Sequence, residues 1–422
     1  MPRKQHGRQY DLLVLGATGY TGKFVAEHVT THLPTDLKWA IAGRSESKLQ
    51  AVMDECHKLN ADRAPPKLEL ANIDDEAELN ALISKAFVVI TTVGPYCKYG
   101  DKVFKACADA GTHYLDCTGE FPWVARMINK YEKTAQKSGA IMFPQSGLES
   151  VPADICTWAM ARFLRSKLDA STSDVVLSIH KLNAAPSGGT LASALGIFDH
   201  FSLQEMRESS KPYASSPVPH HEKPRPSTSI LQAFLGVRNV PNLGLQTTSI
   251  SSTIDIPIVE RTWGLLSQIP SRRDQFYGPK FNWASYYKPR NWLHGILLHW
   301  GLALGSLIIA TLPPVRALLK KFVYKPGEGT GKDALAKEEV EIRGVATPDT
   351  ATPSGKQAYC RAWFHGSIYY LTAVFMAQGA LTILEDDLEL DGGVYTPACL
   401  GQGYVDRLHN AGFKMEVKML PN

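Results

Sequence analysis

The stretch LLVLGATGYTG, residues 12–22, joins a short apolar run to three glycines spaced three apart. The run at its start predicts a strand that is buried on both faces of a parallel sheet, and a helix is expected directly after the glycines. Gly16, Gly19 and Gly22 depart from the usual G-x-G-x-x-G spacing. Strand, glycine turn and helix nevertheless follow in the order that places a pyrophosphate at a helix N-terminus. A glycine-rich turn without a ligand is the alternative.

A second strand, predicted at 37–42, ends in Gly43, Arg44 and Ser45. Sites for NAD commonly place a carboxylate at this point, where it binds the ribose hydroxyls. This chain has an arginine instead, whose permanent charge and several donors suit the 2′-phosphate of NADP. We therefore predict NADP, with NAD as the second choice and a plain surface arginine as the alternative interpretation.

The alternation of strand and helix continues to about residue 145 and predicts a Rossmann-like, doubly wound parallel sheet. Ligands in such sheets bind outside the carboxyl ends of the strands, so residues 93–96 and 118–120 are expected near the nicotinamide. Further strands are predicted at 67–70, 87–96, 112–120 and 140–144, and helices at 45–58, 75–85, 99–110 and 121–137.

Bulk properties indicate a large protein of more than one domain. The chain has 422 residues, a formal net charge of +4 and 20% charged residues, so nothing predicts nucleic-acid binding. The basic N-terminus lacks an apolar core, so a secretion signal is not expected. Seven scattered cysteines without a C-x-x-C pair predict reduced thiols in an intracellular protein, with no metal site.

After residue 145 the pattern changes, and we expect a second, α+β domain over 146–395. Ser150 is predicted to cap a helix that begins at Val151. The turn SGGT, residues 187–190, leads into another helix, and it either binds a polar or anionic group or only caps that helix. Residues 209–229, rich in Pro, Ser and charge, predict a surface loop or poorly ordered insert.

The segment 291–315 contains no Lys, Arg, Asp or Glu and is long enough to enter a bilayer. We expect Trp292 and Trp300 to lie at the membrane interface, and Arg316, Lys320 and Lys321 to face anionic headgroups. Monotopic or hairpin insertion is the preferred interpretation. A full span, and a helix buried in the fold or in an oligomer, are the alternatives.

GATGYTG, AGRSESKL, VGPY, YLDCTGE, GLESVPAD and SGGTLAS occur in motif order over most of the chain. Together they resemble the saccharopine dehydrogenase-like oxidoreductases and the related trans-acting enoyl reductases of mycobacterial lipid synthesis. At Glu149 the chain departs from the pattern, since relatives often carry Asp there. The resemblance implies hydride transfer with a nicotinamide cofactor, a role in glycolipid metabolism, and association with lipid droplets, mitochondria or membranes.

The resemblance also implies a cofactor role for residues of the glycine turn, the arginine turn and the turn after the fourth strand, namely Gly16, Thr18, Gly19, Tyr20, Thr21, Gly22, Arg44, Val93, Gly94, Pro95 and Tyr96. Within the same turns we also predict Ala17, Gly43 and Ser45 to bind the cofactor.

A catalytic acid is harder to choose. No tyrosine has a lysine four residues on, which argues against an ordinary short-chain dehydrogenase. Hydride transfer still needs a group that handles a proton. Tyr96, Asp116 and Glu120 lie at predicted strand ends and are the candidates.

The sequence thus predicts an NADP-dependent oxidoreductase that acts on a small, lipid-linked or otherwise apolar substrate. Its divisions are 1–145, 146–395 and 396–422, the last a helix and strand expected to pack near the cofactor domain. A homodimer is one arrangement considered. A noncatalytic cofactor-binding scaffold on lipid droplets or membranes, and an atypical short-chain-type reductase of a polar carbonyl, are the alternative functions.

Overall fold

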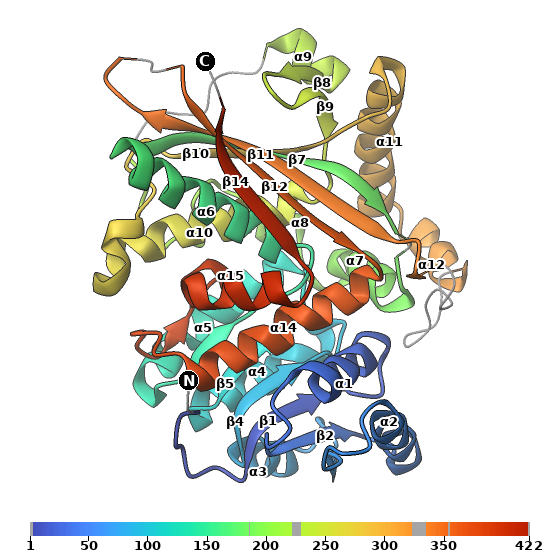
Figure 1. The fold of residues 1–422 in the computed structure, drawn as a ribbon. Coiled ribbons are helices and arrows are strands. Elements are labelled where there is room, and N and C mark those ends of the chain that lie inside the picture. Colours follow the sequence, from blue (N-terminus) through green and yellow to red (C-terminus); the bar gives the residue numbers. More distant parts are fainter. Residues whose placement is uncertain (1–2, 185, 222–228, 323–334, 353–354, 421–422) are drawn as a thin grey trace.

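The protein is described by a computed structural model that covers residues 3–184, 186–221, 229–322, 335–352 and 355–420. Two seven-stranded sheets lie one above the other, with helices α6, α14 and α15 between them (Figure 1). We call them sheet A, which holds the N-terminal strands, and sheet B. The prediction of a Rossmann-like domain followed by an α+β domain is confirmed.

Sheet A is parallel throughout and has the order β13-β6-β5-β4-β1-β2-β3. This is the doubly wound order, with its topological switch between β1 and β4. Its strands are β1 (Tyr10–Leu15), β2 (Trp39–Gly43), β3 (Lys67–Leu70), β4 (Ala86–Thr91), β5 (His113–Asp116), β6 (Ile141–Phe143) and β13 (Gly393–Val394). The helices that alternate with them are α1 (Tyr20–His32), α2 (Glu46–Leu59), α3 (Glu76–Ser84), α4 (Tyr96–Ala110) and α5 (Phe121–Ser138).

Two predicted strands of this sheet were too long. The fourth ends at Thr91, and residues 92–95 form a turn into α4. The fifth ends at Asp116, whose side chain accepts hydrogen bonds from the backbone of the following loop. In both cases the strand ends where hydrogen bonds within the turn replace the hydrogen bonds between neighbouring strands. The β-branched residues of the sequence do not indicate this end point.

Sheet B is mixed, with the order β14-β12-β11-β7-β10-β9-β8. Its strands are β7 (Ser171–Asn183), β8 (Val237–Val240), β9 (Gly244–Thr248), β10 (Asn282–Tyr287), β11 (Glu339–Asp349), β12 (Gln357–His365) and β14 (Lys414–Leu420). The helices of this part are α6 (Val151–Leu168), α7 (Gly188–His200), α8 (Leu203–Ser209), α9 (Ile230–Leu235), α10 (Ser252–Gln268), α11 (Trp292–Thr311), α12 (Pro313–Phe322), α14 (Ile368–Glu385) and α15 (Gly401–Asn410), with 3-10 turns at Pro270–Gln275 and Pro397–Leu400.

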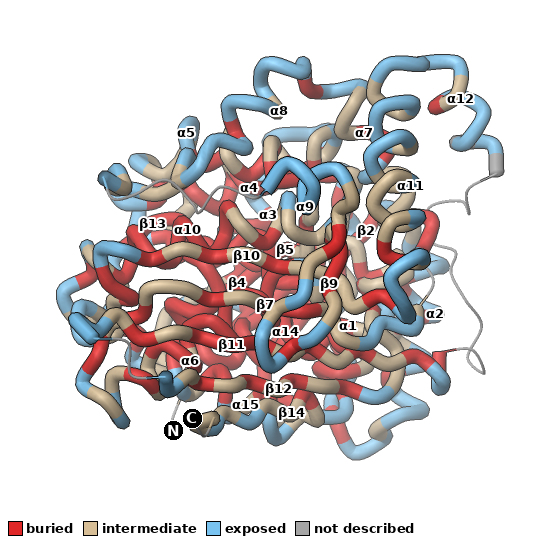
Figure 2. Tube along the Cα trace, turned by 90° about the horizontal axis from the view of Figure 1, so that it is seen from above, coloured by how far each residue is buried: buried red, intermediate tan, exposed pale blue. Residues whose placement is uncertain are grey.

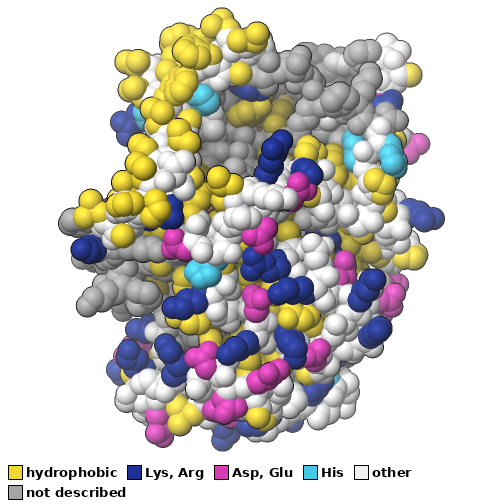
Figure 3. Space-filling model, turned by 180° about the vertical axis from the view of Figure 1, so that it is seen from behind, with side chains coloured by type: hydrophobic (Ala, Val, Ile, Leu, Met, Phe, Trp, Pro, Cys, Tyr) yellow, Lys and Arg dark blue, Asp and Glu magenta, His cyan; other side chains and the backbone are white. Residues whose placement is uncertain are grey.

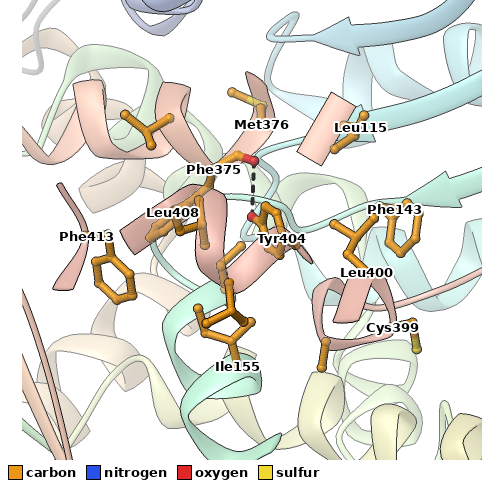
Figure 4. Close-up of a cluster of buried hydrophobic side chains, with 14 of the residues drawn as sticks. Leu115, Phe143, Ile155, Phe375, Met376, Cys399, Leu400, Tyr404, Leu408 and Phe413 are labelled. Carbon is orange, nitrogen blue, oxygen red and sulfur yellow. Dashed lines mark hydrogen bonds between the residues drawn. The ribbon is translucent and has the colours of Figure 1, made fainter. Parts of the chain in front are cut away.

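Helix α14 joins the two halves. It follows β12 of sheet B in the chain, but it packs against α1, β4 and β5 and so covers a face of sheet A. Gly379 permits this approach, since a β-carbon there would lie 2.7 Å from a Leu115 methyl. One core therefore runs from Leu115 and Phe143 of sheet A to α6, α14 and α15, where the Tyr404 hydroxyl donates to the Phe375 carbonyl at 3.1 Å (Figure 4).

The chain end is shared between the two halves. Helix α15 contacts α14 and the final strand, β14, pairs with β12 in sheet B rather than with the cofactor domain. Upstream, β13 crosses back to extend sheet A beside β6. The two paired strands, β13 and β6, are about 250 residues apart in the sequence, so local sequence patterns cannot predict that they pair.

The segment 209–221 is largely the surface loop that its composition predicts, and it is held on the fold at several points. The Tyr213 ring lies 5.0 Å from the ring of Trp263 on α10, and Arg261 donates to the Ser215 carbonyl. Two rings, Tyr213 and His220, provide the apolar surface that lets a Pro- and Ser-rich stretch pack. The remainder of the predicted insert, 222–228, lies outside the described residues.

The apolar segment forms two helices, α11 and α12, that break at Leu312 and stand at the side of the molecule (Figure 1). Figure 2 shows long exposed stretches on them, in contrast to the buried strands. Arg316 was expected to face headgroups, but it is buried and its Nε lies 3.2 Å from Asp199 of α7. Lys321 is exposed, whereas the side chain of Lys320 lies outside the described part.

Candidate active site

The glycine turn lies between β1 and α1, as predicted, and the helix begins at Tyr20. Gly16 has φ +87°, in the left-handed region, and an added β-carbon would lie 2.9 Å from both Thr92 Oγ1 and Val93 Cγ2. Two requirements, backbone conformation and close approach, therefore select glycine there.

Gly22 lets the helix lie directly against the turn. A β-carbon at this position would be 2.2 Å from the Gly16 carbonyl oxygen and 2.8 Å from Ala17 Cα. The first amides of α1 have no carbonyl within the helix to donate to, so they and the helix dipole face the space above the turn. A cradle so narrow that no side chain fits is what close approach of a pyrophosphate requires.

The end of the cradle where the adenosine is expected contains an exposed arginine. Thr18 lies beside Gly43, with its Oγ1 3.7 Å from where a β-carbon would be. Arg44 is exposed and has no hydrogen-bond or ion-pair partner among the described residues, and Ser45 follows it at the start of α2. An unpartnered guanidinium at the end of the second strand fits a 2′-phosphate.

At the other end, the turn after β4 closes on the glycine turn. Thr92 Oγ1 donates to the Gly16 carbonyl at 3.0 Å, and Val93 packs beside the same glycine. Gly94 is exposed and lies near Ser193 of α7. The residues expected near the nicotinamide are thus brought to the switch point of sheet A.

Tyr96, the first catalytic candidate, points into the core. Its hydroxyl donates to the Thr91 carbonyl at 2.9 Å and lies 3.4 Å from Cys117 Sγ. Burial raises its pKa well above the usual value for tyrosine. The side chain anchors the end of β4.

Asp116 and Glu120 have their oxygens occupied by donors. Asp116 accepts from the Tyr114 hydroxyl at 2.6 Å and from the amides of Thr118 and Gln145, both at 2.9 Å. Burial is the largest influence on this carboxyl and raises its pKa to about 6. Glu120 accepts from the first two amides of α4, at 2.8 and 2.7 Å. Asp116 therefore connects the loops after β5 and β6 by hydrogen bonds, and Glu120 caps the N-terminus of α4.

Comparison with known proteins shows the family of this chain. Residues 12–143 match the model of the saccharopine dehydrogenase NADP-binding domain. A Mycobacterium tuberculosis protein is 31% identical over 98% of each chain, and the trans-acting enoyl reductase of Mycobacterium bovis is 30% identical over 97% of each. The chain belongs to the saccharopine dehydrogenase-like oxidoreductases. It is therefore an oxidoreductase with an NADP-binding domain.

Two further comparisons agree with this family. The rat saccharopine dehydrogenase-like oxidoreductase is 29% identical over 97% of each chain. The fold is shared with apo saccharopine dehydrogenase (L-Glu forming) of Saccharomyces cerevisiae, with a TM-score of 0.53, 13% identity, and coverage of 98% of this chain and 100% of that one.

In this oxidoreductase the SGGT turn lies close to the glycine turn. Ser187 caps α7 by accepting from the Thr190 amide, as one of the two interpretations predicts. Thr190 Oγ1 also lies 2.9 Å from the hydroxyl of Tyr369, whose ring packs edge-on against Tyr20 of the glycine turn. Sequence reasoning did not find Tyr369, because only its place at the start of α14 gives it this role.

Two carboxylates near this site, Glu149 and Asp255, were also missing from the predicted catalytic set. Glu149 follows β6 of sheet A, and Asp255 lies in the first turn of α10, between two strands of sheet B. The two residues thus belong to different halves of the molecule. The motif GLESVPAD drew attention to the first. An acidic residue just ahead of Pro257 was the only signal for the second.

Arg44→Ala tests the phosphate contact. We expect the affinity for NADPH to fall roughly 10- to 100-fold, because a hydrogen bond to a charged group contributes about 1.5–3 kcal/mol. The affinity for NADH, which lacks the 2′-phosphate, should be unchanged. Fluorescence titration with both cofactors measures this. Lys58→Ala, at the far end of α2, is the control, and an unchanged preference for NADPH in Arg44→Ala would remove the assignment.

Proposed function

We propose that this protein is an NADPH-dependent reductase that acts at a membrane or lipid-droplet surface inside the cell. Its substrate is a lipid-linked or otherwise apolar molecule with a polarised double bond, in glycolipid metabolism. The names of the mycobacterial relatives support the enoyl chemistry. The apolar surface that stands beside the cofactor site carries the proposal, and mitochondrial membranes are among the surfaces considered.

This surface, which we call the apolar platform, consists of α9, α11 and α12. Helix α11 has 20 residues and only 6% of its most apolar window is buried, whereas α14, the other such helix among the described residues, is 83% buried and belongs to the core. The platform contains exposed Ile230, Leu231, Phe234, Trp292, Leu293, Leu297, Leu304, Leu307, Ile308, Leu312, Leu318 and Leu319. Hydrophobic side chains gather at the corresponding edge in Figure 3.

Side-chain contacts join α9 and α11 of the platform to each other and to sheet B. The rings of Phe234 and Trp300 meet edge-on at 5.3 Å, which joins α9 to α11. His299 Nδ1 lies 2.7 Å from Thr248 Oγ1, which holds α11 on β9. Exposed apolar area on this scale is rare on monomeric soluble proteins and is typical of membrane or protein contact. A hairpin of this length suits insertion into one leaflet.

Helix α7 connects the platform with the cofactor site. It contacts both α11 and α12, and Asp199 pairs with Arg316. On its other side α7 packs on α4, with Gly196 near Cys97. An apolar substrate that leaves the lipid next to α7 therefore has a short path to the nicotinamide end of the site.

A substrate panel tests the function. Purified protein on phosphatidylcholine vesicles receives NADPH and either trans-2-hexadecenoyl-CoA, hexadecanal or a polar 2-oxo acid, and loss of NADPH absorbance is followed. We expect turnover with the first. Turnover of the polar acid alone would favour the short-chain-type alternative, and cofactor binding without any turnover would favour a noncatalytic scaffold.

Leu297→Glu combined with Leu304→Glu tests the platform. Both side chains are exposed, so folding should be retained. Removing a buried leucine from lipid costs about 1.5–3 kcal/mol, and we expect flotation with phosphatidylcholine–phosphatidylserine vesicles to fall at least about tenfold. Leu59→Glu, an equally exposed leucine on α2, is the control. Unaltered flotation, or a dimer that covers α11 and does not float, would reject the membrane contact.

A further inference from the structure

The segment between β6 and α6 is held in place at several points. Gln145 has φ +59°, which is unusual for a residue with a side chain and indicates a fixed conformation. Gly147 packs closely on Cys117, and the Leu148 amide donates to Thr372 Oγ1 of α14 at 3.3 Å. Glu149 is thereby presented at the carboxyl end of sheet A.

The Glu149 carboxylate lies over the loop after β5. Its Oε2 would be 2.0 Å from a β-carbon at Gly119, so it occupies the space of a side chain that this loop lacks. Ile254 of α10 approaches the same point, at 3.4 Å. The carboxylate therefore lies between the end of β5 and sheet B's helix α10, on the side of sheet A where the nicotinamide is expected.

Glu149 differs from the other acidic groups nearby in having no partner. Asp116 and Glu120 accept from amides and a hydroxyl, and Asp154 accepts from the Ala398 amide and the Thr262 hydroxyl. Among the described residues no hydrogen bond or cation is found for Glu149. The residue as a whole is nevertheless exposed, so that solvent reaches part of its side chain, although the carboxyl end lies against Gly119.

The groups that face Glu149 favour its protonated form. Enclosure by the surrounding protein raises its pKa, and the negative charge of Glu120 raises it further. Asp255, on α10, has its own pKa raised by burial and by Glu149, and Cys117 is affected in the same direction. A carboxyl with like charges and no donor around it retains its proton to higher pH.

We propose that Glu149 is the proton donor of the reduction, an inference that rests on the proposed function. The polarised double bond gains a hydride, an electron pair with its hydrogen, at one atom, and NADPH is thereby oxidised to NADP⁺. The Glu149 carboxyl gives its proton to the other atom, which completes the reduced product. The carboxylate regains a proton from water, since solvent reaches part of the side chain.

The variants are Glu149→Gln, which keeps the shape without the acid, and Gly119→Ala, whose methyl group displaces the carboxylate without removing it. Glu78→Gln, the same change at an exposed glutamate of α3, is the control. With trans-2-hexadecenoyl-CoA we expect turnover to fall roughly 100- to 10,000-fold in Glu149→Gln at unchanged NADPH affinity, as for loss of a general acid. Gly119→Ala should also lose turnover. Activity of Glu149→Gln near that of the native chain would overturn the proposal.

Two measurements do not need a substrate. In the cofactor-free protein, the infrared carboxyl signal that disappears in Glu149→Gln should titrate at higher pH than free glutamate. The affinity for NADP⁺ relative to NADPH should rise with pH and lose this dependence in the variant, because only the oxidised ring is positive. If the native chain does not reduce trans-2-hexadecenoyl-CoA, the proposed function fails. The infrared titration and the pH dependence of cofactor affinity then decide the role of Glu149. A Glu149 carboxyl that titrates as free glutamate would overturn its assignment as proton donor.

Discussion

Gly22→Ala is expected to remove most of the affinity for NADPH. The added methyl group would lie 2.2 Å from the Gly16 carbonyl oxygen and 2.8 Å from Ala17 Cα, which are backbone atoms of the turn itself. The turn must open or α1 must shift, and overpacking of this kind costs about 1–3 kcal/mol or more. If this cost falls on the cofactor-bound form, the affinity decreases roughly 5- to 150-fold or more. Calorimetric titration with NADPH measures it.

Two other glycines calibrate this result. Gly19→Ala meets one atom, the same carbonyl oxygen, at 3.2 Å and should have a smaller effect. Gly301→Ala has open space around it and should bind NADPH as the native chain does. If Gly22→Ala binds NADPH normally, the pyrophosphate does not lie on this turn, and the assignment of the cofactor cradle fails.

Local patterns were sufficient to place the residues of the predicted cofactor site in the fold. The glycine turn, Arg44 and the turn at 93–96 each follow a strand, and parallel strands bring their carboxyl ends to one edge. The positions of these residues could therefore be predicted without knowing any contact distant in sequence. The candidates Tyr96, Asp116 and Glu120 were found by the same rule, but it does not distinguish a free acid from one whose oxygens are occupied.

The other half of the site depends on contacts that no local pattern encodes. Helix α14 is apolar on all sides, so its periodicity does not tell which sheet it covers. Its place on sheet A is what brings Tyr369 to the glycine turn. In the same way, Asp255 approaches Glu149 only because α10 reaches the end of sheet A. Packing of the two halves, rather than either sequence segment, creates the acidic region.

The contact between α1 and α14 should make the protein sensitive to acid through His28. This side chain is fully buried, its Nδ1 lies 2.9 Å from the Tyr370 hydroxyl, and its Nε2 lies 3.0 Å from the Gln378 amide. Burial, and to a lesser degree the charge of His32, lowers its pKa to about 3. The folded protein therefore keeps the ring neutral where the unfolded chain protonates it.

The sign of the effect follows from this difference. The stabilisation is present above the unfolded pKa of about 6.5 and is lost as the pH falls toward about 3, because the unfolded state binds the extra proton. Between pH 7 and pH 4 the native chain should lose about 3 kcal/mol more unfolding free energy than His28→Gln, which does not titrate. Urea unfolding at the two pH values measures the difference.

Comparison with a variant separates His28 from the other titrating groups. The raised pKa of Asp116 and Asp154 acts in the opposite direction, since those carboxyls favour the folded state as the pH falls, and His113 acts in the same direction as His28. These contributions cancel when the native chain and His28→Gln are compared. His57→Gln, on the exposed face of α2, should keep the native pH dependence. Parallel curves for the native chain and His28→Gln would mean that the ring is not held neutral between α1 and α14.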